Sequence, residues 1–158
     1  MELDDFDRRL LNLVQSDAGQ TAERLAASVG LSPSAVQRRL KRLRETGVIV
    51  RETAIIDPKC IGSPVSFVVA LQVERERPEM LNQLRAWLEA REQVQQAFYV
   101  TGDADFVLVV TAPDTEAYDG LMSRLMAENP NVKRFTTYVA LGVVKRGLAI
   151  PVPLGAQS

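Results

Sequence analysis

The chain has 158 residues, of which 46% are hydrophobic and 25% charged, and its formal net charge is −1. This is the composition of an ordinary globular protein, with room for one medium domain or two small ones. The balanced charge excludes a uniformly basic nucleic-acid coat protein, so any attraction to a polyanion has to come from a local patch.

The residue types most used in catalysis and metal binding are scarce. The chain has no histidine and one cysteine, Cys60, so it lacks the commonest general base and zinc ligand and cannot form an intramolecular disulfide. No apolar run approaches the ~20 residues of a membrane span, and the acidic N-terminus is unlike a signal peptide. We therefore expect a cytoplasmic, non-enzymatic protein without cofactor, metal or membrane contact.

Three helices are predicted in the first third of the chain. The first runs from about Asp4, its candidate cap, to Gln15, and carries an apolar stripe at helical spacing: Phe6, Leu10, Leu13 and Val14. Residues 21–47 then predict two short helices joined by a tight turn. Thr21 caps the second helix, and Gly30 can take the positive φ of the turn. Ser32 caps the third helix, with a proline at its first position.

The third helix, over residues 33–46, carries five cations against one acid, Glu45. The cations are Arg38, Arg39, Lys41, Arg42 and Arg44. Val36, Leu40 and Leu43 follow the i, i+4, i+7 pattern and must face inward. The outward face is therefore basic and polar, as in a helix that enters the DNA major groove.

Residues in the first turns of such a helix reach base edges, where glutamine can pair with adenine and arginine with guanine. Later cations meet phosphates, and helix starts can hold a phosphate on their backbone N–H groups. The candidate DNA-binding residues are Thr21, Ser32, Ser34, Gln37, Arg38, Arg39, Lys41 and Arg42. The alternatives are a solvated charged face, plain capping by Thr21 and Ser32, and an ion pair between Lys41 and Glu45.

The segment after the third helix changes character. Residues 48–56 predict β structure, a short wing followed by a longer strand, and Asp57-Pro58 and Gly62-Ser63-Pro64 interrupt it. We expect a DNA-binding domain over residues 1–56, a linker over 57–64, a second domain over 65–150 and a tail over 151–158.

The second domain predicts the order βαββαβ. Its expected elements are a strand over 66–73, a helix over 78–89, strands over 95–101 and 106–111, a helix capped by Asp114, and a final strand over 132–144. This order is that of a ferredoxin-like split βαβ repeat. The predicted fold class is therefore α+β, with a winged helix-turn-helix followed by a ferredoxin-like domain.

Both faces of the predicted sheet are apolar. Along 106–110, Phe106, Leu108 and Val110 point one way, while Val107 and Val109 point the other. Two helices cover one face, and the natural cover for the second is the same sheet of another subunit. The resulting dimer suits paired DNA half-sites. The alternative is that residues 147–158 fold back over the open face.

A short loop between two strands is the candidate small-molecule site. It consists of Thr101, Gly102, Asp103, Ala104 and Asp105. Its carboxylates can hold an ammonium group and its exposed amides a carboxylate. Thr137 on the last strand can add a hydroxyl contact or remain part of the sheet. The alternatives for the loop are an ordinary turn, an acid–base pair or a Mg²⁺ site.

Across residues 2–150 the chain resembles the Lrp/AsnC (feast/famine) family of transcriptional regulators. The resemblance rests on LDDFDRRLLNLVQSDAGQT, RLAASVGLSPSAVQRRLKRLRETGVI, AIIDPKCIG, FYVTGDADFVLVV and TTYVALGVVK. It implies an N-terminal DNA-binding domain and a C-terminal regulatory domain called RAM. It also implies a dimer that assembles further, to a tetramer or octamer, and an amino acid bound between subunits near the glycine and aspartates of FYVTGDADFVLVV.

The sequence thus predicts a cytoplasmic, nucleoid-associated regulator that binds specific double-stranded DNA and responds to a small amino-acid-like effector. One alternative is an effector-independent architectural DNA-binding protein. Another is an enzyme on the same two-domain layout. Siroheme decarboxylases resemble this family but rely on histidines, which this chain lacks.

Overall fold

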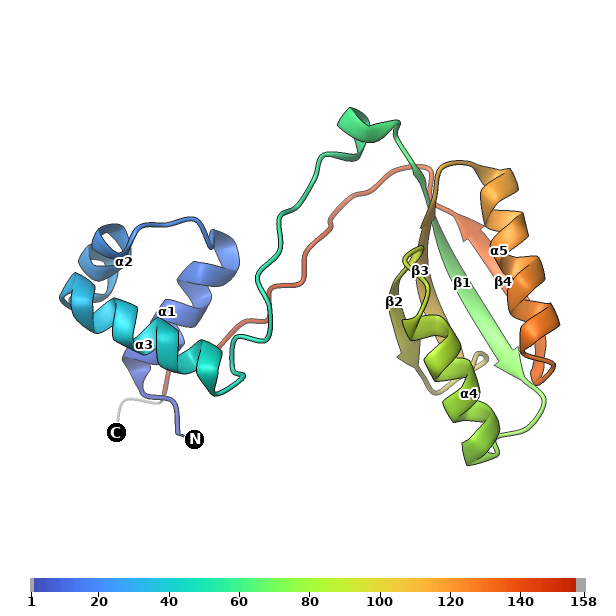
Figure 1. Ribbon diagram of the computed structural model, residues 1–158, viewed down its shortest axis with the longest axis horizontal. Coiled ribbons are helices and arrows are strands. Elements are labelled where there is room, and N and C mark those ends of the chain that lie inside the picture. The colour runs from blue at the N-terminus through green and yellow to red at the C-terminus, as the bar shows by residue number, and fades with distance from the viewer. Residues whose placement is uncertain (1, 156–158) are drawn as a thin grey trace. The chain divides into compact units, whose positions relative to one another are not determined.

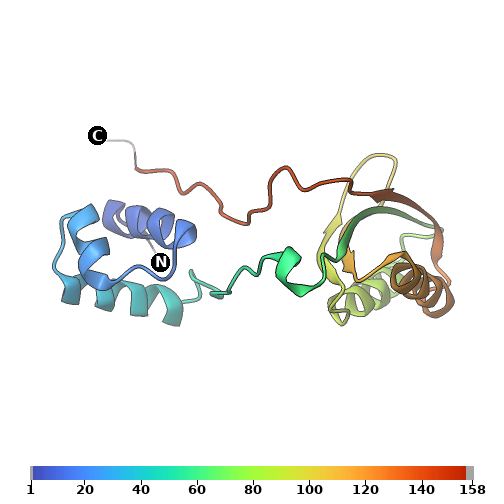
Figure 2. The same cartoon turned by 90° about the horizontal axis from the view of Figure 1, so that it is seen from above.

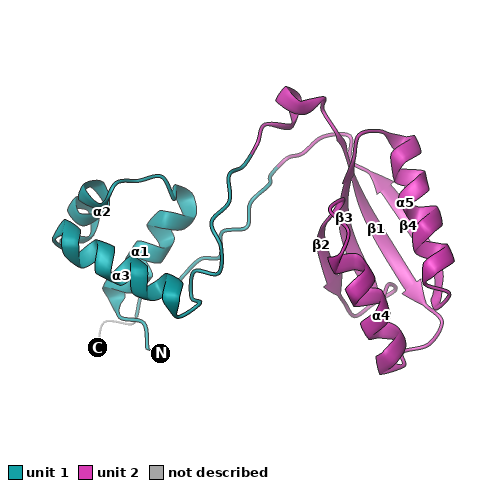
Figure 3. Ribbon diagram, viewed as in Figure 1, with its two compact units in different colours: residues 1–55, 145–158 teal, residues 56–144 magenta. Residues whose placement is uncertain are grey.

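The computed structural model describes residues 2–155 and divides the chain into two compact units (Figure 3). The first unit comprises residues 1–55 and 145–158, and the second comprises residues 56–144. The expected division placed residues 145–150 in the second domain and left the tail separate. The difference arises because tail residues 150–155 form hydrogen bonds with the first helix.

The first unit contains the three predicted helices: α1 (Asp5–Ser16), α2 (Ala22–Val29) and α3 (Pro33–Glu45) (Figure 1). All three predicted caps are confirmed, because the side chains of Asp4, Thr21 and Ser32 each accept a backbone N–H of the first turn. Gly30 ends α2 with φ 75° and supplies the tight turn into α3.

A small apolar core holds the three helices together. Val36, Leu40 and Leu43 of α3 are buried, as predicted, and Leu10 and Leu25 meet them from α1 and α2. Burying a side chain of this size contributes about 1.5–3 kcal/mol. The outer face of α3 is thereby left to solvent.

The strand predicted over residues 48–56 was wrong. The structure gives this segment no strand, and Val50 and Ile55 are exposed. A strand forms only where a second strand pairs with its backbone groups, and within residues 2–155 no strand pairs with this segment. The expected linker contains a short 3₁₀ helix, η1 (Pro58–Ile61).

The second unit has the predicted βαββαβ order. Its elements are β1 (Val65–Val73), α4 (Pro78–Glu89), β2 (Val94–Tyr99), β3 (Phe106–Ala112), α5 (Thr115–Glu128) and β4 (Val132–Val139). The strands form one antiparallel sheet in the order β2-β3-β1-β4. The ferredoxin-like prediction is therefore confirmed.

The last strand is shorter than predicted, because β4 ends at Val139 and not at residue 144. Val139 pairs with Phe67, close to the start of β1, and Ala140 donates one further backbone bond to Ser66. Only Val65 of β1 lies beyond that point, and Leu141 and Val144 are fully exposed. The length of the neighbouring strand, not the apolar pattern, sets the end of β4.

The two faces of the sheet are covered differently. Helices α4 and α5 both lie on one face (Figure 2), where Phe67, Leu108 and Leu121 are fully buried. On the opposite face Phe98 and Tyr138 are half-exposed. The described tail residues bond to α1, so the alternative that residues 147–158 fold back over this face is not supported. No helix within residues 2–155 is long and apolar enough to span a membrane.

Candidate nucleic-acid interface and ligand loop

The first turns of α3 present three exposed polar side chains, Ser34, Gln37 and Arg38. The Ser34 hydroxyl lies 3.1 Å from the hydroxyl of the cap, Ser32. The Arg38 side chain forms no hydrogen bond or ion pair with any other residue between 2 and 155. Its five N–H donors are therefore available to a partner outside the chain.

Two further cations of α3 form exposed ion pairs. The Lys41 ammonium lies 3.7 Å from Glu45, one helical turn away, as the sequence allowed. Arg44 lies 2.7 Å from Glu52. Exposed pairs of this kind contribute less than about 1 kcal/mol, so an incoming phosphate can displace either carboxylate.

The remaining two cations of α3 meet a buried carboxylate of α1. The side chain of Asp7 is 1% exposed. One of its oxygens accepts a hydrogen bond from Arg39 at 2.8 Å, and the other accepts one from Arg42 at 2.5 Å. Arg39 also donates to Asp4 at 2.7 Å. Through these bonds Asp7 becomes the link that fixes α3 against α1.

The ionisation of this cluster follows from its contacts. The hydrogen bond that Arg39 donates to the Asp7 carboxylate raises the pKa of Arg39, although partial burial opposes the change. Burial alone would raise the pKa of Asp4. The backbone N–H of Asp7 and the Arg39 guanidinium outweigh it and hold the pKa of Asp4 below its ordinary value. Both shifts favour the charged forms of Asp4 and Arg39.

The two capping residues use their side chains within the fold. The Thr21 hydroxyl accepts from the N–H of Arg24 at 3.3 Å, and the Ser32 hydroxyl accepts from the N–H of Ala35 at 3.2 Å. Both residues are exposed, so the starts of α2 and α3 face solvent. Capping is confirmed for both residues, and it leaves other N–H groups of the first turns without intrahelical partners.

The loop between β2 and β3 is tied to the end of β1. The Asp105 carboxylate accepts from the N–H of Val73 at 2.7 Å, and the Asp105 N–H donates to the carbonyl of Leu71 at 2.9 Å. Gly102 has φ +121°, a conformation that L side chains rarely adopt. One of the two candidate carboxylates is thus used to brace the loop.

The other carboxylate of the loop, Asp103, is exposed and has no partner among residues 2–155. Its backbone carbonyl accepts a hydrogen bond from the Gln72 side chain, whose amide oxygen accepts from Arg134 at 2.7 Å. These hydrogen bonds, which connect β4 through β1 to the loop, were not predicted from the sequence. They follow from the strand pairing, in which Gln72 lies opposite Arg134.

Thr137 lies apart from the loop. It pairs with Val69, a fully buried residue, and its hydroxyl is 2.5 Å from the Tyr118 hydroxyl of α5. Burial raises the pKa of this tyrosine, against the effect of the hydrogen bond to Thr137. Thr137 therefore faces the helices, and the structure does not bring it together with Thr101, Gly102, Asp103, Ala104 and Asp105.

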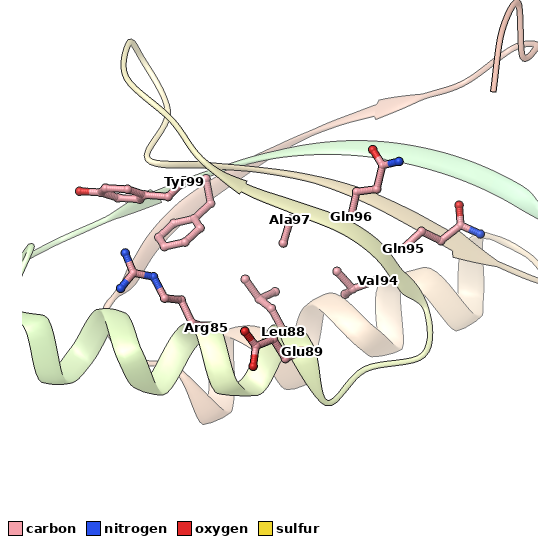
Figure 4. Close-up of a pocket in the computed structure, with 9 residues that line it drawn as sticks. Arg85, Leu88, Glu89, Val94, Gln95, Gln96, Ala97 and Tyr99 are labelled. Atoms are coloured by element: carbon pink, nitrogen blue, oxygen red, sulfur yellow. The ribbon is translucent and has the colours of Figure 1, made fainter. Parts of the chain in front are cut away.

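A shallow cavity of about 350 Å³ lies between α4 and β2 (Figure 4). Leu88 and Val94 are among its apolar lining residues, and the Arg85 guanidinium lies 5.3 Å from the centroid of the Tyr99 ring. None of the candidate loop residues lines it. Within residues 2–155, no three acidic, cysteine or histidine side chains gather to hold a metal ion.

Two family models match the chain over ranges that correspond to its two units. A winged helix-turn-helix DNA-binding model matches residues 3–50, which contain α1, α2 and α3. The model described as the Lrp/AsnC ligand binding domain matches residues 66–150, more than half of the chain. The chain belongs to the Lrp/AsnC family. It is therefore a DNA-binding transcriptional regulator with a ligand-binding domain.

Curated relatives in the Lrp/AsnC family match over nearly the full length. An HTH-type transcriptional regulator of Sinorhizobium fredii is 45% identical over 154 residues, which cover 98% of this chain and 91% of that protein. The leucine-responsive regulatory protein of Salmonella typhimurium is 32% identical, covering 92% of this chain and 88% of the relative. The first is named as a transcriptional regulator and the second as a regulatory protein.

Solved structures show the same architecture. An AsnC family transcriptional regulator from Agrobacterium tumefaciens has a TM-score of 0.86 at 28% identity, covering 94% of this chain and 97% of that one. A transcriptional regulator from Neisseria meningitidis, solved as an L-Met complex, has a TM-score of 0.85 at 23% identity, covering 95% and 97%. The second likeness is one of fold alone.

Proposed function

We propose that this Lrp/AsnC regulator reads DNA with the exposed face of α3. Ser34, Gln37 and Arg38 contact base edges in the major groove, because the first turns of a recognition helix reach deepest there. The observation that carries this assignment is the pairing of the cations. Arg38 has no partner within residues 2–155, whereas each of the other four α3 cations meets a carboxylate.

The remaining candidates act on the sugar–phosphate backbone or on the position of α3. Lys41 and Arg42 are exposed enough to reach phosphates, and the starts of α2 and α3 at Thr21 and Ser32 add backbone N–H groups. Arg39 is 22% exposed and bonded to two aspartates. We assign Arg39 to holding α3 in place and not to DNA contact.

The test is Arg38→Ala, measured by DNA binding on genomic fragments selected by the wild-type protein. Specific binding should weaken by about 1–3 kcal/mol, while nonspecific binding changes far less. Arg124→Ala, which removes an exposed arginine from α5, is the matched control and should bind as the wild type does. Unchanged specific affinity in Arg38→Ala would place the base contacts elsewhere.

A homodimer formed through the open face of the sheet supplies the second recognition helix. Val68, Phe98 and Tyr138 are exposed there, and apolar residues on a sheet face favour a cover. A twofold axis would present two α3 helices to half-sites about 34 Å apart. Sedimentation should give a dimer or a higher assembly such as a tetramer or octamer. A monomer at all concentrations would remove this part of the proposal.

A small amino-acid effector binds at the loop of residues 101–105. Support comes from the ligand-binding description of the matched family model and from Asp103, whose unpaired carboxylate suits an ammonium group. The Neisseria regulator that shares this fold was solved with L-Met, which makes methionine a reasonable first probe alongside the other amino acids. A bound effector should raise the melting temperature.

The matched variants for this site are Gly102→Ala and Gly142→Ala. Gly102 needs its positive φ, whereas Gly142 has a φ outside that region and open space around it. Gly102→Ala should reduce the effector-induced melting shift and leave DNA binding intact. If no amino acid shifts the melting temperature of the wild type, the alternative is favoured, an effector-independent architectural protein. We propose action in the cytoplasm at the nucleoid, and no enzymatic role.

A further inference from the structure

The C-terminal tail is bonded to one face of α1 within the first unit, with which Figure 3 colours it. Six hydrogen bonds join residues 150–155 to this helix in the part of the chain that the structure describes. The side chains of α1 that form them are Asp5, Arg8, Asn12 and Gln15. Residues 151–155 lie beyond the stretch matched by the ligand-binding family model.

Two side-chain amides of α1 each hold one tail residue at both of its backbone groups. Asn12 donates to the carbonyl of Val152 at 2.8 Å and accepts from its N–H at 3.0 Å. Gln15 does the same for Ile150, at 2.9 Å and 2.7 Å. An amide is suited to this role because it carries a donor and an acceptor side by side. The two amides thus hold the tail as a neighbouring strand would.

The tail sequence is complementary to this arrangement. Residues 150–153 read Ile-Pro-Val-Pro, and the two prolines have no N–H to donate. The two remaining N–H groups, of Ile150 and Val152, both donate to α1. Proline also restricts the free chain, so less conformational entropy is lost on docking. The segment therefore leaves no backbone donor unmatched.

The length of the tail matches the length of α1 along the whole contact. Positions 5, 8, 12 and 15 share one face of a helix, and ten helical residues rise about 15 Å. Five residues of extended, proline-rich chain span about 15.5 Å. The tail runs antiparallel to α1, with Ile150 at Gln15 and Gly155 at Asp5. Helix and tail therefore stay in register from one end of the contact to the other.

One apolar anchor accompanies the hydrogen bonds. Val152, which lies between the two prolines, is partly buried against the core of the three helices. Ile150 and Leu154 remain largely exposed. The contact therefore combines a central apolar residue with polar bonds on both sides, which is the composition of a specific peptide contact.

We propose that this face of α1 is a binding site for an extended peptide in which proline alternates with aliphatic residues, and that its occupant is the tail of the same chain. The docked tail gives the first unit a second covalent connection to the ligand-binding domain, through β4. A consequence, which rests on the proposed function, is that docking restrains α3, because Asp7 of the same α1 holds Arg39 and Arg42.

Hydrogen exchange of the full chain tests the docking directly. The N–H groups of Ile150 and Val152 should exchange at least about tenfold more slowly than in an unstructured peptide of the same sequence. Asn12→Ala combined with Gln15→Ala should abolish that protection. Arg9→Ala, at an exposed position of α1 outside these bonds, should retain it. Free-peptide exchange rates in the wild type would overturn the proposal.

A disulfide distinguishes the chain's own tail from that of a second copy. In a Cys60→Ser background, Asn12→Cys with Val152→Cys should oxidise to a cross-linked species that runs as a monomer. A cross-linked dimer would overturn the assignment to the same chain. Absence of any cross-link would overturn the contact itself.

The effect on DNA separates this inference from the proposed function. The Asn12→Ala and Gln15→Ala double variant should bind specific DNA about threefold or more weakly than the wild type. If the double variant loses the exchange protection of the tail but binds DNA with unchanged affinity, the proposed restraint on α3 is overturned. A wild type that binds no DNA would overturn the proposed function, while exchange would still decide whether the tail docks.

Discussion

An aspartate braces the candidate contact segment in each unit, but the two aspartates have different partners. Asp7 in the first unit is buried and meets two guanidinium groups from α3. Asp105 in the second unit accepts a single backbone N–H, that of Val73. In both places a neighbouring polar group is left unpaired among residues 2–155: Arg38 on α3 and the Asp103 carboxylate in the loop.

In each unit one residue holds the candidate contact segment in place, and a different residue is available to bind a partner. Ion pairs to Asp7 hold α3, whose outer face stays available for DNA. A backbone N–H bonded to Asp105 holds the loop of residues 101–105, whose Asp103 carboxylate stays available for a ligand. The supporting residue is buried or partly buried, and the contacting residue is exposed. Removing a support should therefore reduce stability, whereas removing a contacting group should change binding alone.

The largest expected effect is that of Asp7→Asn. Removing one partner of a buried ion cluster leaves the other charges uncompensated. Since Arg39 and Arg42 are partly exposed and can be rehydrated, we expect a loss of about 2–3 kcal/mol. Urea unfolding followed by far-ultraviolet circular dichroism measures it. Fluorescence of Trp87, which lies in the second unit, should change little.

The control for this variant is Glu45→Gln, which removes the exposed partner of Lys41. Its cost should be below about 0.5 kcal/mol. Equal losses in the two variants would mean that burial of Asp7 contributes nothing, and the contrast between supporting and exposed ion pairs would fail.

Asp105→Ala should cost the second unit about 1–2 kcal/mol, because the Val73 N–H loses its acceptor in a partly buried place. Unfolding followed by Trp87 fluorescence reports this loss. Asp103→Ala is the matched variant and should stay within about 0.5 kcal/mol of the wild type, while losing the effector response. A destabilised Asp103→Ala would show that both aspartates are structural.

Thr137→Val should cost about 1 kcal/mol, because the mostly buried Tyr118 hydroxyl loses its partner. Thr136→Val, at an exposed position on the opposite face, should be close to neutral. An effector response that disappears in Thr137→Val, without loss of stability, would instead restore Thr137 as a ligand contact.

The smallest expected effect is a change in the stability of the fold at acid pH. Because the pKa of Asp4 is lower in the folded protein than its ordinary 3.8, its ionised form stabilises the fold. That contribution is complete above the unfolded pKa and is lost as the pH falls through the lower folded value. The difference in unfolding midpoint between the wild type and Asp4→Asn should therefore disappear at acid pH. A constant gap would remove Asp4 from the ionic support of α3.

Local signals allowed most of the first unit to be predicted. Asp4, Thr21 and Ser32 cap helices through bonds within four residues, and Gly30 makes its turn through its own backbone. The inward face of α3 follows from helical periodicity alone. These features depend on neighbours in the sequence, so the sequence is enough to place them.

The errors and omissions all involve distant partners. The expected strand over 48–56 has no strand to pair with, and β4 stops where β1 begins. The ion cluster joins positions about thirty residues apart, and nothing near Asp7 in the sequence indicates that Arg39 and Arg42 lie over it. The bonds of the tail to α1 span 135 residues or more.

The sequence by itself determined which segments are helical, which face of α3 is polar, and that the second domain has βαββαβ order. The tertiary structure decided which charges remain available, how far the last strand extends, and where the tail lies. The physical reason is the range of the interactions. Caps, turns and periodicity act within about one helical turn, whereas ion pairing, strand length and docking depend on groups that only folding brings together.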